Sequence, residues 1–334
     1  QRQMCIRDRN IWIAHIWYIE MGKVCFGIDV GGTTVKIGLF TTEAKLIDSM
    51  EIPTRKEDDG SHILPDICAA IDAKLVEKQI TRDDLLGIGI GIPGPITKDG
   101  TVLNCVNLGW GIFNVEEKLS QMLGGVKVKA GNDANVAALG ETWQGGGRGF
   151  EDLVLVTLGT GVGGGVIIGG KIIAGSNGAA GEIGHIPAVF GDDAETCGCG
   201  KKGCLETVGS ATGIVREAKK LLAKSEEDSV LRGMEEFTCK DIFDAAKDGD
   251  KLSMEVVDKL AYYLGNAIAG IAAVTNPQVI VIGGGVSKAG KFLLDKIEEN
   301  FLANAFHATK NAKFALATLG NDAGMYGAAA LILD

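Results

Sequence analysis

The chain has 334 residues, which is enough for two domains of ordinary size, each with its own hydrophobic core. Its 33 Lys and Arg against 43 Asp and Glu give a net charge of −10, which argues against nucleic acid or an anionic membrane as partner. Glycine accounts for 49 residues, about twice the usual ~7%, so we expect many turns in which the backbone approaches a neighbour or a ligand.

Residues 1–20 are interpreted as a non-native or mis-called extension, because Met21 opens a stretch typical of a protein start. The apolar run 11–19 is nine residues long, whereas a helix that spans a bilayer needs ~20. No small-residue cleavage site follows it, which disfavours a signal peptide. The alternative is an interfacial anchor.

Two strand–turn–strand units lie about half a chain apart, which predicts two similar α/β halves facing each other. Each glycine turn can offer successive backbone N–H groups to a phosphate. The expected units are strands 24–29 and 35–40 around Gly31–Thr34, and strands 153–158 and 166–168 around Gly159–Gly165.

The other expected elements alternate between helices and strands, which indicates the α/β class. The expected strands are 86–92, which ends in Pro93-Gly94-Pro95, and 279–282, which ends in Gly283-Gly284-Gly285. The expected helices are 61–78, 132–142, 212–224, 240–247, 252–275, 291–300 and 322–333. We interpret helix 252–275 as a buried core helix rather than a membrane span. The expected domains are 21–137 with the closing helix 322–334, and 138–321.

The second glycine turn also fits two nucleotide-binding patterns that the flanking residues disfavour. Gly159–Gly164 matches G-x-G-x-x-G, but that fingerprint needs a helix next, and the β-branched residues 166–168 follow instead. Gly165–Lys171 matches G-x-x-x-x-G-K, but Ile172 stands where a P-loop has Ser or Thr. One glycine turn is usually structural, whereas two in matching units, with a third at Gly283–Gly285, favour phosphate binding.

Asp29 ends the first strand immediately before its glycines. A carboxylate at this position can meet hydrated Mg²⁺ while Gly31, Gly32 and Thr33 contact phosphates. The alternative is an aspartate that only forms the turn.

Asn132-Asp133 follows a strand and Gly131 at the start of an expected helix. Either side chain could be a helix N-cap that satisfies free N–H groups. The functional alternative is that Asp133 is a base that accepts a proton from a sugar hydroxyl.

Three of the eight cysteines cluster in Cys197-Gly-Cys199-Gly-Lys-Lys-Gly-Cys204, and the others scatter. This is not a disulfide framework, so we expect a reducing cytoplasm. The spacing suits a tetrahedral Zn²⁺, with His185 as the nearest histidine for the fourth ligand. The alternative is reduced, buried cysteines. The same metal would position Glu182 and Glu206, and two carboxylates beside an imidazole suit a polyol.

Taken together, these motifs resemble the ROK family of sugar kinases and repressors, within the actin-like ATPase superfamily. The resemblance runs from about Met21 to Asp334. It rests on Asp29-Val-Gly31-Gly32-Thr33, Gly131-Asn132-Asp133-Ala-Asn135, Leu158–Gly165, Gly181-Glu182-Ile-Gly184-His185, and Cys197-Gly-Cys199-Gly200 with Gly203-Cys204-Leu-Glu206. Within the family, the chain is most similar to members that phosphorylate glucose, partly through Asn107-Leu108-Gly109-Trp110.

The resemblance implies two actin-like, ribonuclease H-like α/β domains with the active site in the cleft between them. It implies that Asp133 is the catalytic base and that His185, Cys197, Cys199 and Cys204 bind structural Zn²⁺. The implied sugar contacts are Gly94, Asn107, Asn132, Asp133, Glu182, His185 and Glu206. The implied contacts with ATP and Mg²⁺ are Asp29, Gly31, Gly32, Thr33, Gly159, Thr160, Gly161, Gly283, Gly284 and Gly285.

The expected reaction is ATP-dependent phosphorylation of glucose to glucose 6-phosphate by a homodimer. The same chemistry on N-acetylmannosamine, N-acetylglucosamine, fructose or allose is the first alternative. A sugar-sensing transcription regulator is the second. Family repressors carry an N-terminal DNA-binding module, which residues 1–20 are too short to form.

Overall fold

The computed structural model describes residues 23–333, so the interpretation of residues 1–20 lies outside the described part of the chain. The chain divides into two compact units. One unit ends at Asp133 and takes in the last helix from Gly324 onward, and the other comprises Ala134–Ala323.

The first unit is built on a five-stranded sheet in the order β3-β2-β1-β4-β7. The strands β1, β2 and β3 pair antiparallel, whereas β4 pairs parallel with both β1 and β7. The strands are β1 (Val24–Val30), β2 (Thr34–Thr41), β3 (Leu46–Pro53), β4 (Leu85–Ile92) and β7 (Val128–Asn132).

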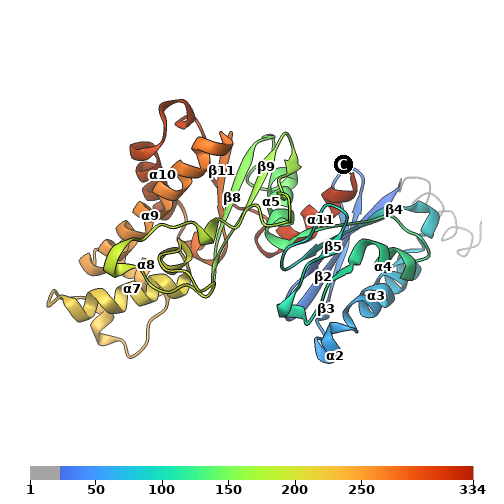
Figure 1. Ribbon diagram of the computed structural model, residues 1–334, viewed down its shortest axis with the longest axis horizontal. Coiled ribbons are helices and arrows are strands. Elements are labelled where there is room, and N and C mark those ends of the chain that lie inside the picture. Colours follow the sequence, from blue (N-terminus) through green and yellow to red (C-terminus); the bar gives the residue numbers. More distant parts are fainter. Residues whose placement is uncertain (1–22, 334) are drawn as a thin grey trace, which may run out of the picture. The chain divides into compact units, whose positions relative to one another are not determined.

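Helices α3 and α4 pack their apolar sides against this sheet (Figure 1). Ile67 and Ile71 of α3 and Leu119 of α4 are fully buried in the same core as the strands. The remaining elements of this unit are α2 (Glu57–Gly60), α3 (Ile63–Lys78), β5 (Thr101–Val102), β6 (Phe113–Asn114), α4 (Val115–Met122) and α11 (Ala323–Leu333).

A row of glycines on the first sheet receives helix α11. Gly27 is paired with Gly38 on one side and with Gly89 on the other. A Cβ atom at Gly27 would lie 2.1 Å from the Met325 carbonyl oxygen, and one at Gly89 would lie 1.6 Å from that of Ala328. The backbone of α11 therefore rests directly on the sheet, which only glycine permits. Part of the glycine excess thus serves helix packing rather than turns.

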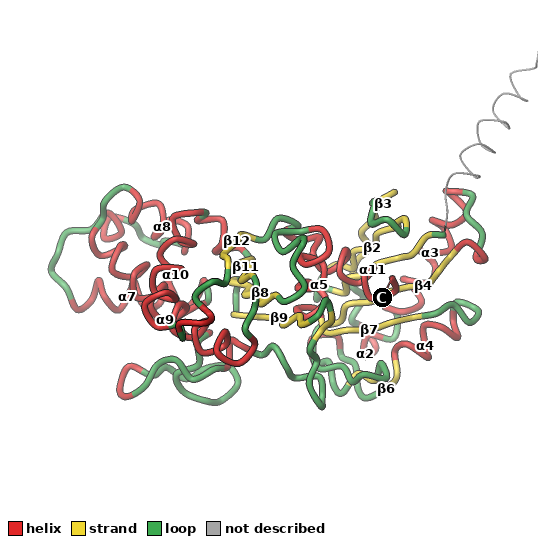
Figure 2. Tube along the Cα trace, turned by 90° about the horizontal axis from the view of Figure 1, so that it is seen from above, coloured by secondary structure: helices red, strands yellow, loops and turns green. Residues whose placement is uncertain are grey.

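The second unit repeats this topology in a sheet of order β10-β9-β8-β11-β12. Strands β8, β9 and β10 pair antiparallel, and β11 pairs parallel with β8 and β12. Figure 2 shows β9, β8, β11 and β12 in this order. The expected duplication of an α/β unit is therefore confirmed. The strands are β8 (Leu153–Leu158), β9 (Val162–Ile168), β10 (Lys171–Ile172), β11 (Val279–Gly283) and β12 (Lys313–Leu316).

Helix α9 is the long helix of the second unit, and it is buried on one side only. Leu260, Leu264 and Ile268 lie in the core, but Tyr262 and Val274 are exposed. No helix in the described chain is both long and apolar enough to traverse a lipid bilayer. The helices are α5 (Asp133–Gln144), α6 (Glu206–Gly209), α7 (Ala211–Lys224), α8 (Cys239–Lys247), α9 (Lys251–Thr275) and α10 (Lys291–Asn304).

The second glycine turn is shorter than the sequence predicts. Strand β9 begins at Val162, so the turn is residues 159–161 and the glycines 163–165 belong to the strand. A Cβ at Gly164 would lie 2.4 Å from the Ile183 side chain, and one at Gly165 would lie 2.6 Å from the Ala138 Cβ. These glycines are needed because the segment around Ile183 and helix α5 pack closely against the strand.

Candidate functional site

Asp133 stands at the junction between strand β7 and helix α5. Strand β7 ends at Asn132, and α5 begins at Asp133, where the positive end of the helix dipole favours a carboxylate. The Asn132 amide donates hydrogen bonds to the Gly94 carbonyl oxygen at 3.1 Å and to Asp133 Oδ1 at 3.0 Å. Position 94, between Pro93 and Pro95, has φ +100°, a backbone conformation that favours glycine. The structure therefore joins three predicted residues of the first unit into one network.

Asn107 lies in a small closed loop next to the Gly94 turn. The loop contains a short 3-10 helix, Val106–Leu108, and Asn107 itself is exposed. A Cβ at Gly94 would lie 3.4 Å from the carbonyl oxygen of Asn104, so the turn and the loop are in close contact. Asn107 was predicted as a sugar contact only from the family resemblance. The structure brings its loop to the Gly94 turn, whose carbonyl accepts the hydrogen bond from Asn132.

The first glycine turn leaves its phosphate candidates accessible. Gly32 and Thr33 are exposed, and Gly31 N–H bonds the Thr34 carbonyl at 3.0 Å. The Thr54 hydroxyl, directly after β3, donates to the Gly31 carbonyl at 2.8 Å and so fixes the turn. Asp29, half-buried at the end of β1, lies against the start of α11, because a Cβ at Gly324 would come 2.5 Å from its carboxyl carbon.

The second unit gathers the four predicted metal ligands. One ligand atom from each of His185, Cys197, Cys199 and Cys204 lies within 4.8 Å of the others. Two separations are 3.7 Å, between Cys197 Sγ and His185 Nδ1, and 3.6 Å, between the Sγ atoms of Cys199 and Cys204. Tetrahedral Zn²⁺, with Zn–S of about 2.3 Å, separates neighbouring ligand atoms by roughly 3.5–3.8 Å. The donor set and its spacing therefore fit zinc.

The local chain closes around the thiols, whose pKa values depart from the ordinary value. Backbone bonds from Cys197 N–H to Lys201 and from Gly200 N–H to Cys197 close the loop. Burial raises the pKa of Cys197 to about 12 and raises that of Cys204, whereas the Lys201 backbone N–H lowers the pKa of Cys199. Two buried thiols would ionise at neutral pH only beside a positive charge.

Both predicted carboxylates of the second unit lie beside these ligands. Glu206 begins α6; its Oε1 is 3.6 Å from Cys197 Sγ, and its Oε2 accepts the Val162 N–H at 3.0 Å. Glu182 Oε2 is 3.9 Å from His185 Nε2, and its side chain is 58% exposed. The two nitrogens of His185 therefore face different groups, Nδ1 the thiol cluster and Nε2 the carboxylate.

A cavity of about 440 Å³ in the second unit joins the glycines of two predicted turns. Gly159 and Thr160 line it from the turn after β8, and Gly285 lines it from the turn after β11. Gly283 is buried at the end of β11, and Gly284 and Gly161 lie beside the lining residues. The rest of the lining belongs to no motif and was not predicted: Ala211, Cys239, Lys240, Phe243, Asp244, Lys247, Val286, Lys288 and Ala289.

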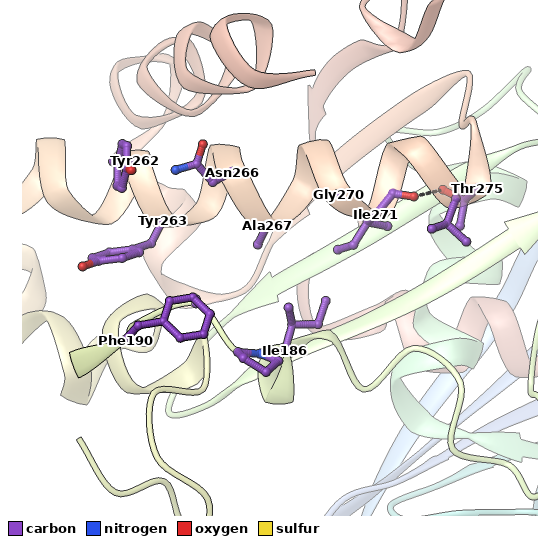
Figure 3. Close-up of a pocket in the computed structure, with 12 residues that line it drawn as sticks. Ile186, Phe190, Tyr262, Tyr263, Asn266, Ala267, Gly270, Ile271 and Thr275 are labelled. Atoms are coloured by element: carbon purple, nitrogen blue, oxygen red, sulfur yellow. Dashed lines mark hydrogen bonds between the residues drawn. The ribbon is translucent and has the colours of Figure 1, made fainter. Parts of the chain in front are cut away.

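A second hollow, of about 750 Å³, runs along helix α9 (Figure 3). Figure 3 shows Ile186 and Phe190 across the hollow from Tyr263, Ala267 and Ile271. The Phe190 side chain is 76% exposed. None of the residues predicted for catalysis or binding lines this hollow.

Comparison with known proteins identifies the family. The ROK family model matches residues 25–334, and the chain belongs to the ROK family. It is 46% identical to a curated glucokinase of Halalkalibacterium halodurans, over 95% of this chain and 94% of that protein. It is 32% identical to a xylose repressor of Caldicellulosiruptor bescii, over 94% of this chain and 79% of the repressor.

A solved structure supports the same assignment. The ROK family glucokinase of Streptomyces griseus, crystallised with glucose and AMPPNP, has a TM-score of 0.71 and 34% identity to this chain. The match covers 92% of this chain and 98% of that one. The duplicated α/β topology is the actin-like ATPase fold, as the resemblance implied.

Proposed function

We propose that the protein is a glucokinase that transfers the γ-phosphoryl group of ATP to the 6-hydroxyl of glucose. The observation that carries the proposal is Asp133 at the start of α5, held by Asn132, in a chain 46% identical to a curated glucokinase. Phosphoryl transfer needs positioning and charge stabilisation more than covalent chemistry, and these residues are suited to positioning.

Asp133 acts as the general base in this proposal. As the 6-oxygen bonds to the γ-phosphorus, its proton passes to the Asp133 carboxylate, and the bond from the γ-phosphorus to the bridging oxygen breaks to release ADP. Asn132 keeps the carboxylate oriented through its 3.0 Å hydrogen bond. Gly94, Asn107, Glu182, His185 and Glu206 contact the sugar hydroxyls, whose donors and acceptors suit amides, carboxylates and an imidazole.

We assign the 440 Å³ cavity beside the second glycine turn to the nucleotide. Its apolar wall of Ala211, Phe243 and Val286 suits a base, and its lysines suit phosphate or ribose oxygens. The backbone at Gly159–Gly161 and Gly283–Gly285, together with Gly31, Gly32 and Thr33, would serve the triphosphate. Asp29 would hold hydrated Mg²⁺, which neutralises charge on the phosphates when bound.

Zinc is proposed as structural. His185, Cys197, Cys199 and Cys204 would fill all four positions, which leaves none open for a reacting group. The ion would hold the segment between His185 and Glu206 and so keep Glu206 bonded to Val162, the first residue after the glycine turn.

A panel of sugars with coupled detection of ADP tests the proposed activity. Glucose should give the highest kcat/KM among glucose, N-acetylmannosamine, N-acetylglucosamine, fructose and allose. A higher value for another sugar would reassign the substrate within the same chemistry. No sugar-dependent ADP release from folded protein would contradict the kinase assignment.

A sugar-sensing regulator is the second candidate, because the chain is 32% identical to a xylose repressor. The net charge of −10 disfavours it, since DNA binding relies on cationic contacts with phosphates. A gel-shift assay against restriction fragments of the source genome distinguishes the two, and the kinase assignment predicts no retained DNA at physiological salt.

We further propose a homodimer that forms through the exposed side of α9. Residues 260–275 contain no Asp, Glu, Lys or Arg, although Tyr262 and Val274 face solvent. An uncharged, partly apolar helix face is typical of the centre of a subunit interface. Light scattering should give twice the chain mass, and Val274→Glu should give monomers.

The seven described cysteines form no disulfides, which supports the proposed cytoplasmic location.

A further inference from the structure

The buried indole of Trp110 makes one specific polar contact. Its Nε1 donates a hydrogen bond of 3.0 Å to the carbonyl oxygen of Gly60, and the residue is only 5% exposed. The indole N–H is the only hydrogen-bonding group on a tryptophan side chain, so this contact uses it fully. Phe113 meets the ring edge to face, with centroids 5.2 Å apart.

The turn that Trp110 binds lies within the segment labelled α2, but its backbone is left-handed rather than α-helical. Asp58, Asp59 and Gly60 all have positive φ, at 52°, 56° and 67°. A non-glycine residue in this region is strained and persists only where its surroundings impose it. The Trp110 hydrogen bond fixes the carbonyl at the end of this turn, so the turn and the indole hold each other.

The turn and the Asn107 loop pack backbone against backbone. A Cβ at Gly60 would lie 2.2 Å from the Leu108 carbonyl oxygen. A Cβ at Gly109 would lie 3.1 Å from Asp59 Cα. A methyl group at Gly60 would overlap the Leu108 carbonyl, and Gly109 is favoured by its φ of +76° together with the tight contact. A small movement of the turn would therefore move the loop.

The loop is closed at its base and connects with the turn that Asn132 binds. Cys105 and Trp110 exchange backbone hydrogen bonds of 2.8 and 3.1 Å, so Asn107 lies inside a closed six-residue loop. The Leu103 N–H bonds the Pro95 carbonyl at 3.1 Å, which ties the loop to the Pro93–Pro95 segment. Contacts thus run without interruption from Gly60 through Trp110 and the loop to that segment.

We infer that Trp110 is a positioning residue: its hydrogen bond to Gly60 sets the position of the Asn107 loop and thereby the affinity for the sugar. This inference rests on the proposed function, in which Asn107 contacts the sugar. Trp110 itself touches neither the sugar nor the nucleotide in this account. Its loss should affect sugar binding and leave ATP binding and the phosphoryl-transfer step largely unchanged.

Trp110→Phe tests the inference, because phenylalanine keeps an aromatic ring against Phe113 but lacks the N–H donor and the second ring of the indole. We expect KM for glucose to rise about 5- to 20-fold, the size of effect that a lost buried hydrogen bond produces. KM for ATP and kcat should each stay within about twofold. Trp143→Phe, at the end of α5 remote from Asp133, is the matched control and should leave KM for glucose unchanged.

Gly60→Ala tests the same contact from the other side, and Gly170→Ala is its control. The two glycines have similar φ, +67° and +75°, but Gly170 has no atom within 4 Å of the added Cβ. Gly60→Ala should raise KM for glucose, and Gly170→Ala should not. The double variant with Trp110→Phe should raise KM by less than the product of the single effects, because both changes break one contact.

Three outcomes are distinguishable. No turnover of any sugar by the wild-type protein would contradict the proposed function. If the wild type phosphorylates a sugar but Trp110→Phe leaves its KM unchanged, only the inference is overturned. A fall of kcat and a rise of both KM values, in parallel with a lower Tm, would likewise overturn it, because that pattern indicates general destabilisation.

Discussion

The Glu206 carboxylate lies 3.6 Å from Cys197 Sγ through one oxygen, while its other oxygen accepts the Val162 N–H. One side chain thus links the thiol cluster with the end of the second glycine turn. The cysteine cluster and the glycine turn are separate features of the sequence, and the fold makes them neighbours. Loss of the metal should therefore affect substrate binding as well as stability.

Cys199→Ser should release zinc, lower Tm and raise KM for glucose, because three ligands hold the ion less well than four. Elemental analysis of protein purified without chelator measures the metal, and the sugar assay measures KM. Cys68→Ala is the control, since Cys68 is a buried thiol outside the cluster, and it should keep the zinc. Wild-type protein that is active and free of zinc would contradict the assignment.

Gly89→Ala should lower the free energy of unfolding of the first unit by about 1–3 kcal/mol or more, since overpacking typically costs that much. Its Cβ would lie 1.6 Å from the Ala328 carbonyl oxygen, so α11 must move off the sheet. Gly233→Ala is the control, because nothing lies within 4 Å of its added Cβ. Urea denaturation measures both variants. Equal stabilities would show that α11 does not rest on the glycine row.

Glu217→Gln should lower stability at pH 7 by about 1–3 kcal/mol, because Glu217 is buried and binds Lys259 at 2.6 Å and Lys220 at 3.0 Å. Burial alone would raise the Glu217 pKa, but the two ammonium groups lower it below its ordinary value.

A depressed folded-state pKa stabilises the protein above the unfolded pKa, and this stabilisation is lost as pH falls through the folded value. The Tm difference between wild type and Glu217→Gln should therefore be full at pH 7 and shrink below about pH 4. Asp295→Asn, which removes an exposed pair with Lys291, should change Tm little at either pH. A Tm difference for Glu217→Gln that is the same at pH 7 and pH 3 would contradict this account.

Elements with a clear local pattern were predictable. The strand at Val24 and the long helix ending at Thr275 were expected within one or two residues of their bounds, because apolar runs and Asn-Pro punctuation mark them. Strand β3, with its mixed polar sequence, was missed, as was the short helix α4. These elements form because neighbouring strands and the core supply their partners.

The site was predictable where chemistry leaves a short motif. The thiol spacing and the Asn132-Asp133 pair can be recognised in the sequence. The distances between the metal-ligand atoms and the hydrogen bond from Asn132 to Asp133 can be read only from the structure. Glycines 163–165 were misplaced because glycine in a turn and glycine under a packed helix look alike in a sequence. The lining of the 440 Å³ cavity was missed, since Phe243 and Val286 are ordinary apolar residues until the fold brings them together.

The role of Asp133 is the central claim, and Asp133→Asn tests it most directly. Asparagine keeps the size and much of the capping ability of aspartate but cannot accept the proton. Asp250→Ala is the comparison, because Asp250 is a helix N-cap whose loss costs ~0.5–2 kcal/mol of stability and should leave kcat unchanged. Calorimetry with glucose measures binding, and coupled detection of ADP measures kcat.

We predict that Asp133→Asn melts near the wild-type Tm, binds glucose, and turns over at least ~100-fold more slowly. Near-normal kcat in this variant would show that Asp133 only caps α5, and the base would then have to be sought elsewhere, first at Glu182.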